Sequence, residues 1–288
     1  MGWIKDLFGK NKENEQPEVP AKKEDSSSKA KKGRERRYSF LAEDVFETSR
    51  MQGVFVVGTI HGKIREGDIV YVYQPKKPVK EFHVLAIELK PREVAEMAKN
   101  ERVALCLDAE SVDEISKYAV LSSVNAQEIE KATGSVENPR LFGLMMEYAR
   151  LFENSGYMDS LLYELCQARF VLPLYMDRPP MPNPDGTLSF GEDAKVGFRS
   201  IKKWDDTEKT VFPVFTDWGA LWYWKDAFYE GQPKQTVTLR LPEVLSFVKK
   251  GHAGLVVNPF GPVPVYFPIE LLEKVEESEP YKEILLAK

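Results

Sequence analysis

Short apolar runs separated by glycine-containing turns follow one another from residue 38 onward. Residues 53–60 are almost entirely apolar, residues 62–68 are typical of a turn, and residues 69–73 again favour a strand. Further apolar runs continue to residue 124 at spacings of roughly ten residues, without a long helical pattern. This pattern predicts a small closed antiparallel β-barrel over residues 38–124.

Three glycines in this region have specific expected roles. Gly58 interrupts an apolar strand, where the absence of a side chain relieves crowding as the strand bends around a barrel. Gly62 and Gly67 flank a tight turn, in which glycine adopts a positive φ without steric cost. We interpret all three as structural residues.

Residues 125–288 alternate helical and strand-like patterns, which predicts an α/β or α+β domain. Residues 125–138 contain turn-forming residues and are interpreted as a linker that ends in the helix-start signal Asn138-Pro139. Helices are expected over residues 140–152, 157–168, 218–228, 242–251 and 268–278, and strands over 169–176, 196–204, 209–217, 236–241 and 253–260. Residues 178–184 are interpreted as a proline-rich loop followed by an Asp185-Gly186 turn.

The N-terminal 37 residues have a different composition. Residues 1–8 place Trp3, Ile4, Leu7 and Phe8 on one side of a short helix. Residues 9–37 contain ten basic and six acidic residues and almost no large apolar side chains, so they are predicted to be a disordered basic tether. The first segment is interpreted as one that docks on a partner or frays, with weak peripheral membrane contact as the alternative.

Composition limits the broad class of protein. The chain has 288 residues and a net charge of −5, which favours two domains and argues against nucleic-acid binding by the whole chain. It has two cysteines and three histidines, and no Cys pair or Cys/His cluster has the spacing of metal ligands. We find no signal peptide and no apolar run long enough to span a bilayer, so we expect a cytoplasmic location.

The predicted barrel resembles domain 2 of elongation factor Tu and related translational GTPases. The matching stretches are Glu43–Phe46, Gly53–Gly58, Gly62–Asp68, Asn100–Leu105, Asp113–Ile115 and Val120–Leu121, in the order and at the spacing of the family. The resemblance covers residues 38–124 and implies the fold of that domain. In the family, the barrel lies beside a GTPase domain and contacts ribosomal RNA or aminoacyl-tRNA.

No GTPase accompanies the barrel in this sequence. The phosphate-binding pattern GxxxxGK[ST] does not occur, so the resemblance implies a binding surface and no nucleotide hydrolysis. The candidate surface comprises Lys63, Arg65, Tyr71 and Tyr73, since basic residues interleaved with aromatic ones bind single-stranded nucleic acid. Acidic residues on the same barrel favour a solvated surface of mixed charge instead.

The second part resembles the N-terminal domain of the SseB (enhanced serine sensitivity) family. Phe170–Pro173, Val211–Asp217 and Gly254–Gly261 carry this resemblance, which covers about residues 141–275. It implies no enzymatic activity.

A few residues in this second part are candidates for a binding surface. They are Trp218 and Trp222, together with the turn of Asn258, Pro259, Phe260 and Gly261. The alternative is that the tryptophans pack into the core and that the residues of the Asn258–Gly261 segment simply form a turn. Asp217 is expected to cap a helix, and His252 to lie at a helix end.

No trio of Ser, His and Asp or of Cys and His is indicated, so we propose no catalytic residues, metal ligands or cofactor. The leading hypothesis is a non-enzymatic binding or adaptor protein that recognises a protein partner. An RNA- or ribosome-associated factor is the main alternative. An enzyme with a site near Asn258 and the tryptophans is a further one.

Overall fold

The computed structural model describes residues 38–49, 51–176, 181–182, 188–189, 196–228 and 235–286. The predicted amphipathic turn and basic tether of residues 1–37 lie outside the described residues. The proline-rich loop and the Asp185-Gly186 turn also fall outside them, apart from a two-residue strand pair, β12 (Met181–Pro182) and β13 (Leu188–Ser189).

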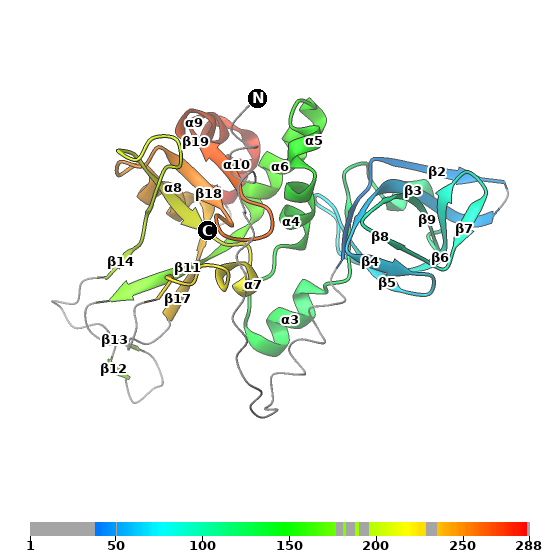
Figure 1. Cartoon of the computed structure of the whole chain (residues 1–288), viewed down its shortest axis with the longest axis horizontal. Helices are drawn as coiled ribbons and strands as arrows, with labels where there is room; N and C mark the ends of the chain where they lie inside the picture. The colour runs from blue at the N-terminus through cyan, green and yellow to red at the C-terminus, as the bar shows by residue number, and fades with distance from the viewer. Residues whose placement is uncertain are drawn as a thin grey trace, which may run out of the picture. The chain divides into compact units, whose positions relative to one another are not determined.

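Residues 38–124 form the expected closed barrel (Figure 1). Its six strands pair antiparallel in the order β1-β10-β5-β6-β9-β3, and pairing of β3 with β1 closes the ring. The strands are β1 (Ser39–Leu41), β3 (Met51–His61), β5 (Ile69–Tyr73), β6 (Lys80–Lys90), β9 (Arg102–Leu107) and β10 (Val120–Ser122). The prediction of a small antiparallel barrel is confirmed.

Shorter elements extend the barrel. Strand β2 (Asp44–Thr48) pairs with β3, β7 (Glu93–Ala95) with β6, and β4 (Lys63–Arg65) with β8 (Met97–Lys99). A 3₁₀ turn, η1, covers Val112–Glu114.

Side chains of the barrel strands alternate between its interior and its exterior, as the period of a strand requires. On β3, Val54, Val56 and Ile60 belong to the barrel core, whereas Phe55 belongs to a separate small cluster with Ala86 and Cys106. At Gly58 a Cβ atom would lie 2.0 Å from the carbonyl oxygen of Leu41, which confirms the role expected for this glycine.

The segment after the barrel differs from the prediction. Residues 126–133 form helix α3 (Ala126–Thr133), where an irregular linker was expected. Its N-cap is Asn125, whose Oδ1 accepts a hydrogen bond from the Glu128 amide, and Gly134 ends it with a φ of 70°. None of its residues is buried, so the helix does not need the row of apolar residues by which a core-facing helix is predicted from sequence. Its caps are the signal that the prediction missed.

The expected helical hairpin follows as α4 (Pro139–Met146), α5 (Tyr148–Leu151) and α6 (Ser155–Gln167). One continuous first helix was predicted, but it breaks at Glu147. The side chain of Glu147 is buried and engaged in hydrogen bonds outside the helix. Asn154 caps α6 by accepting a hydrogen bond from the Tyr157 amide.

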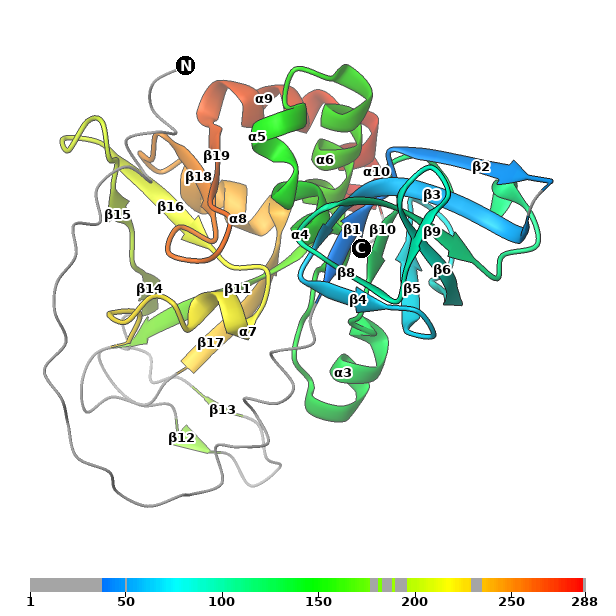
Figure 2. The ribbon, with the colours of Figure 1, turned by 45° about the vertical axis from the view of Figure 1, so that its right-hand side comes forward.

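Two sheets complete the second part (Figure 2). One has the order β14-β11-β17, with strands β14 (Val196–Phe198), β11 (Arg169–Met176) and β17 (Gln235–Arg240). The other has the order β15-β16-β18-β19, with strands β15 (Ile201–Lys202), β16 (Thr210–Val214), β18 (Gly254–Val257) and β19 (Val265–Pro268). Strands β16 and β18 are parallel, and the other pairs in both sheets are antiparallel.

The predicted strand over residues 196–204 is therefore two strands in different sheets, and only β15 forms the expected hairpin with β16. The helices of this part are α7 (Trp218–Leu221), α8 (Leu241–Val248), α9 (Ile269–Glu277) and α10 (Glu279–Leu286). Helix α7 is much shorter than predicted, and α10 follows the helix that was expected to be last.

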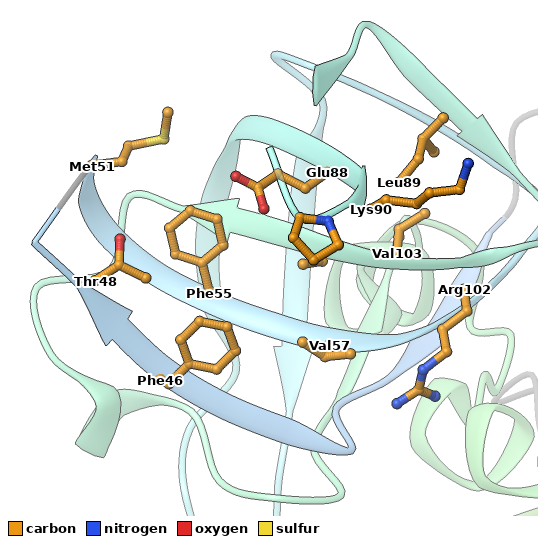
Figure 3. Close-up of a pocket in the computed structure, with 12 residues that line it drawn as sticks. Phe46, Thr48, Met51, Phe55, Val57, Glu88, Leu89, Lys90, Arg102 and Val103 are labelled. Carbon is orange, nitrogen blue, oxygen red and sulfur yellow. The ribbon is translucent and has the colours of Figure 1, made fainter. Parts of the chain in front are cut away.

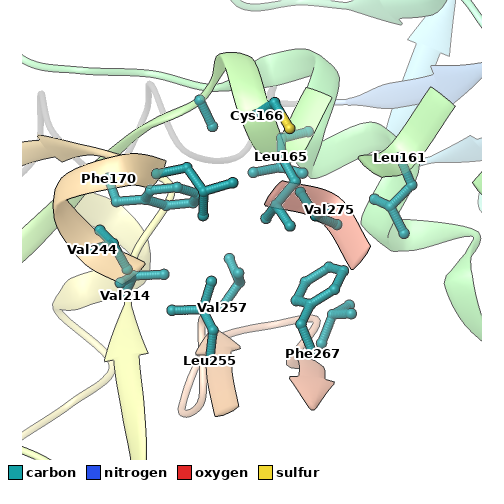
Figure 4. Packing of buried hydrophobic residues seen from close by; sticks show 14 of the residues in the cluster. Leu161, Leu165, Cys166, Phe170, Val214, Val244, Leu255, Val257, Phe267 and Val275 are labelled. Atoms are coloured by element: carbon teal, nitrogen blue, oxygen red, sulfur yellow. The ribbon is translucent and has the colours of Figure 1, made fainter. Parts of the chain in front are cut away.

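Helices and both sheets share one apolar core (Figure 4). Leu161 and Leu165 of α6, Phe170 of β11, Val257 of β18 and Val275 of α9 all contribute to it. Each of these side chains is almost completely buried, and burial of a side chain of this size stabilises the fold by about 1.5–3 kcal/mol.

The barrel strands β1 and β10 also contribute to this core. Phe40 and Leu121 point into the barrel, whereas their neighbours Leu41 and Val120 belong to the core of the second part. Helix α4 packs closely on these strands, since a Cβ atom at Gly143 would lie 2.4 Å from Cγ1 of Val120.

A network of charged side chains joins the barrel to the helical hairpin beside this contact. The Glu147 carboxylate, 3% exposed, lies 2.6 Å from Nε2 of His61 and 2.8 Å from Nε of Arg150. An ionised carboxylate only accepts hydrogen bonds, so the His61 nitrogen is the donor. Arg150 also makes two hydrogen bonds to Glu43 of the barrel. Burial by itself raises the pKa of Glu147, but the hydrogen bonds from His61 and Arg150 outweigh it and hold the pKa below its usual value.

This network predicts a loss of stability in acid. Because the pKa of Glu147 is lower in the folded than in the unfolded protein, its contribution to stability is complete above the usual glutamate pKa of 4.5 and declines as the pH falls further. We expect Glu147→Gln to lower the free energy of unfolding at pH 7 by about 1–3 kcal/mol. The difference from the wild type should narrow below pH 4.5.

Urea denaturation followed by tryptophan fluorescence at several pH values measures this difference. Glu153→Gln, which removes a carboxylate from an exposed position nearby, is the control and should be neutral. A deficit for Glu147→Gln that stays constant with pH would contradict the assignment.

Candidate functional site

A pocket of about 460 Å³ opens on the outer face of the barrel (Figure 3). It lies where strands β2, β3, β6 and β9 run beside one another. Its lining is mainly apolar and comprises Phe46, Thr48, Met51, Phe55, Val57, Glu88, Leu89, Lys90, Pro91, Arg102, Val103 and Ala104.

Strand register brings the two phenylalanines of the pocket together. Phe46 of β2 pairs with Phe55 of β3, and both face outward. Their rings stack with centroids 5.7 Å apart and planes inclined by only 9°. Phe46 is 37% exposed, whereas Phe55 is almost fully buried against Ala86 and Cys106. The outer ring therefore offers a flat aromatic surface that rests on a buried support.

Some of the charged side chains that line the pocket form ion pairs and one does not. Lys90 forms an ion pair with Glu93 at 3.4 Å, and Arg102 forms one with Glu43 at 2.6 Å. Glu88 is partly buried and makes no ion pair with any residue in the described part of the chain. Figure 3 shows its carboxylate on the same side of the sheet as the Phe55 ring.

The thiol of Cys106, which packs against Phe55 behind the pocket, has little reactivity. Burial raises the pKa of Cys106, and the nearby charge of Glu88 raises it further. Burial likewise raises the pKa of Cys166, the other cysteine, to about 12. Since the thiolate is the nucleophilic form, neither side chain is suited to covalent catalysis at neutral pH.

The candidate residues of the barrel hairpins do not gather at this pocket. Lys63 and Arg65 lie on β4, in a two-stranded ladder with β8. Tyr71 and Tyr73 lie on β5, which pairs with β6 and β10 instead.

The hydroxyl of Tyr73 donates to the Val124 carbonyl at 2.7 Å and accepts from the Ala126 amide at 2.9 Å. This tyrosine therefore ties the start of α3 to the barrel.

The candidate residues of the second part do come together. Phe260 stacks on Trp224 with centroids 5.2 Å apart, and Trp224 stacks on buried Phe215. Trp218 and Trp222 form a tilted pair at 6.1 Å around the short helix α7. Phe260 is 41% exposed and Trp222 50% exposed, so these two residues do not pack fully into the core. Gly261 approaches the Cβ of Ala220 on α7.

Asn258 organises the turn that carries Pro259 and Phe260. It follows β18, is completely buried and has a φ of 53°. Its Oδ1 accepts a hydrogen bond from the Thr216 amide at 2.9 Å, and its Nδ2 donates to the Thr216 hydroxyl at 3.0 Å. That hydroxyl in turn donates to Asp217, whose other oxygen accepts from the Ala220 amide as the expected N-cap of α7.

These polar groups therefore satisfy one another. His252 was expected at the surface of a helix end. It does follow α8, but it is partly buried, and its Nδ1 lies 2.8 Å from the hydroxyl oxygen of Thr210. Burial lowers its pKa. Among the described residues, no group of three or more His, Cys, Asp or Glu side chains is arranged to hold a metal ion. No helix in the described ranges is both long and apolar enough to cross a membrane.

Sequence reasoning missed the pocket as a site. Each of its strands was expected, and the matching stretch Glu43–Phe46 even includes one of its rings. The missing information was the register that places Phe46 opposite Phe55 and the strand pairing that places β9 and β6 beside them. Two aromatic residues at outward positions of adjacent strands were the available signal.

Comparison with known proteins supports part of the expected relationship. Residues 145–274 match the family model described as SseB protein N-terminal domain, which agrees with the resemblance of the second part. This match includes α6, both sheets and most of α9. No curated protein matches the chain.

The Asn258 turn predicts a specific pair of mutational effects. Asn258→Ala should lower the free energy of unfolding by about 2–4 kcal/mol, because it removes two buried hydrogen bonds and places a Cβ-bearing residue of low left-handed propensity at positive φ. Asn258→Gly removes the same hydrogen bonds but tolerates the φ, so its loss should be smaller by about 1 kcal/mol. Chemical denaturation measures both, and equal losses would show that the backbone conformation contributes nothing.

Proposed function

We propose that the protein is a non-enzymatic binding protein that recognises a protein partner through the outer pocket of its barrel. The observation that carries this proposal is the stacked pair Phe46 and Phe55, which forms an open aromatic floor. Exposed apolar side chains continue around it, since Met51 is 39% and Val94 59% exposed. Contiguous exposed apolar surface of this kind is typical of a contact site for another molecule.

The resemblance to domain 2 of elongation factor Tu-like proteins is consistent with this use. In that family the barrel contributes a binding surface, and here we propose that the surface is retained without the nucleotide chemistry. The SseB-like part would then present the barrel, or bind a second partner through Phe260 and Trp222. We place this activity in the cytoplasm.

Selection of peptides from a displayed random library on the immobilised full-length chain tests the proposal. We expect enriched peptides whose affinity falls at least about tenfold with Phe46→Ser, because the variant removes an aromatic contact at the centre of the site. Ile69→Ser, which removes an exposed apolar side chain of β5 outside the pocket, should leave the affinity unchanged. Unchanged melting temperatures for both variants would show that the fold is intact.

The absence of enrichment, or equal binding by all three proteins, would contradict the proposal. Enriched peptides that depend on Ile69 rather than Phe46 would place the binding surface elsewhere on the barrel.

A separate observation favours RNA binding as the second candidate function. Lys63 and Lys99 lie directly opposite one another in the β4–β8 ladder, and Arg65 follows on the same short strand. Like charges in opposed positions are destabilising, and none of these three side chains has an ion-pair partner in the described part of the chain. An anionic partner such as an RNA backbone would relieve this repulsion.

Fluorescence anisotropy with a labelled oligouridine tests the second candidate. We expect weak, salt-sensitive binding. The slope of the logarithm of the binding constant against the logarithm of the salt concentration should decrease in magnitude by about one for each of Lys63→Gln and Lys99→Gln. Lys282→Gln, at an exposed position of α10, is the matched control. No binding at low salt, or equal effects of all three variants, would exclude this role for the ladder.

A further inference from the structure

The carboxylate of Glu88 is the least explained charge at the pocket. It is partly buried beside the apolar cluster of Phe55, Ala86 and Cys106. Removing a carboxylate from water costs free energy unless a cation or several hydrogen-bond donors compensate it. The described part of the chain supplies Glu88 with neither an ion pair nor a side-chain hydrogen bond.

The two cations nearest in the lining do not compensate it. Lys90 pairs with Glu93, and Arg102 pairs with Glu43, a carboxylate that Arg150 also contacts. Among the charged side chains of the lining, Glu88 is therefore the one without an ion-pair partner in the described part of the chain.

The aromatic rings of Phe46 and Phe55, like the carboxylate of Glu88, favour a positively charged ligand. The faces of Phe46 and Phe55 carry the negative part of the ring quadrupole, and the outer face of Phe46 is open to solvent. A cation placed over an aromatic face is attracted to it, and a carboxylate within reach strengthens the attraction. An anionic ligand would meet repulsion from both groups.

From this charge complementarity we infer that the pocket binds a lysine side chain of the partner protein, flanked by apolar residues. The lysine methylene stem would lie over the rings of Phe46 and Phe55, and its ammonium group would reach Glu88, whose carboxylate lies beside the Phe55 ring in Figure 3. Neighbouring apolar residues of the partner would cover Met51 and Val94. This inference rests on the proposed function and specifies the chemistry of the partner.

The peptides selected on the full-length chain provide the test. We expect them to share a lysine between apolar residues, and synthetic copies in which norleucine replaces that lysine should bind about tenfold more weakly. Norleucine retains most of the apolar stem and lacks the charge. With Glu88→Gln the two peptides should bind within about twofold of each other. With Glu66→Gln, the same charge change at an exposed turn of the barrel, the tenfold preference should persist.

The outcomes separate this inference from the proposed function. Peptides that depend on Phe46 but bind equally well with lysine or norleucine would overturn the charge inference and leave the proposed function standing. A lysine preference that persists in Glu88→Gln would also overturn it, because another group would then recognise the cation. Failure to select any peptide would count against both.

Discussion

The pairing of β1 with β3 closes the barrel, and the rest of the described structure depends on that closure. A closed ring fixes which side chains face inward, since successive residues of a strand point to opposite sides. Phe40 and Leu121 consequently fill the barrel, while Leu41 and Val120 on the same two strands face the helical hairpin and complete a second core. The same alternation on β3 turns Phe55 outward and creates the floor of the pocket.

The contact between barrel and hairpin combines apolar packing with a buried charge. Gly143 allows α4 to approach Val120 closely, and the Glu147 network lies beside this approach. The described residues belong to one compact unit, in agreement with a contact of this kind. A buried ion pair adds little net stability compared with apolar packing, but removing one partner leaves an uncompensated charge. Glu147 therefore acts mainly to specify how α4 and the barrel meet.

Glu147 and Glu88 are two carboxylates shielded from water to different degrees, since Glu147 is almost fully buried and Glu88 only partly buried. Glu147 has His61 and Arg150 as donors, which explains its lowered pKa and its structural role. Glu88 has no such donors in the described residues and lies beside an open aromatic surface. A carboxylate whose charge is compensated by donors of the same chain stabilises a contact between two parts of the fold. A carboxylate without such donors is available to a cation of another molecule.

The sequence by itself determined the elements whose signals are local. Strands such as β3 and β5, the cap at Asp217 and the SseB-like motifs all follow from residues near one another in the chain. Gly62 and Gly67 have the expected positive φ, but the single turn predicted over residues 62–68 is wrong, because strand β4 lies between them and pairs with distant β8. Tertiary structure decided the features that depend on distant residues. Helix α4 ends at Glu147 because its carboxylate meets His61 of the barrel, and β14 and β15 separate because they pair with different strands. The pocket needs Phe46, Phe55 and Glu88 from three strands at once, so no local pattern specifies it. Strand order and register are long-range constraints, and they place these side chains on one wall.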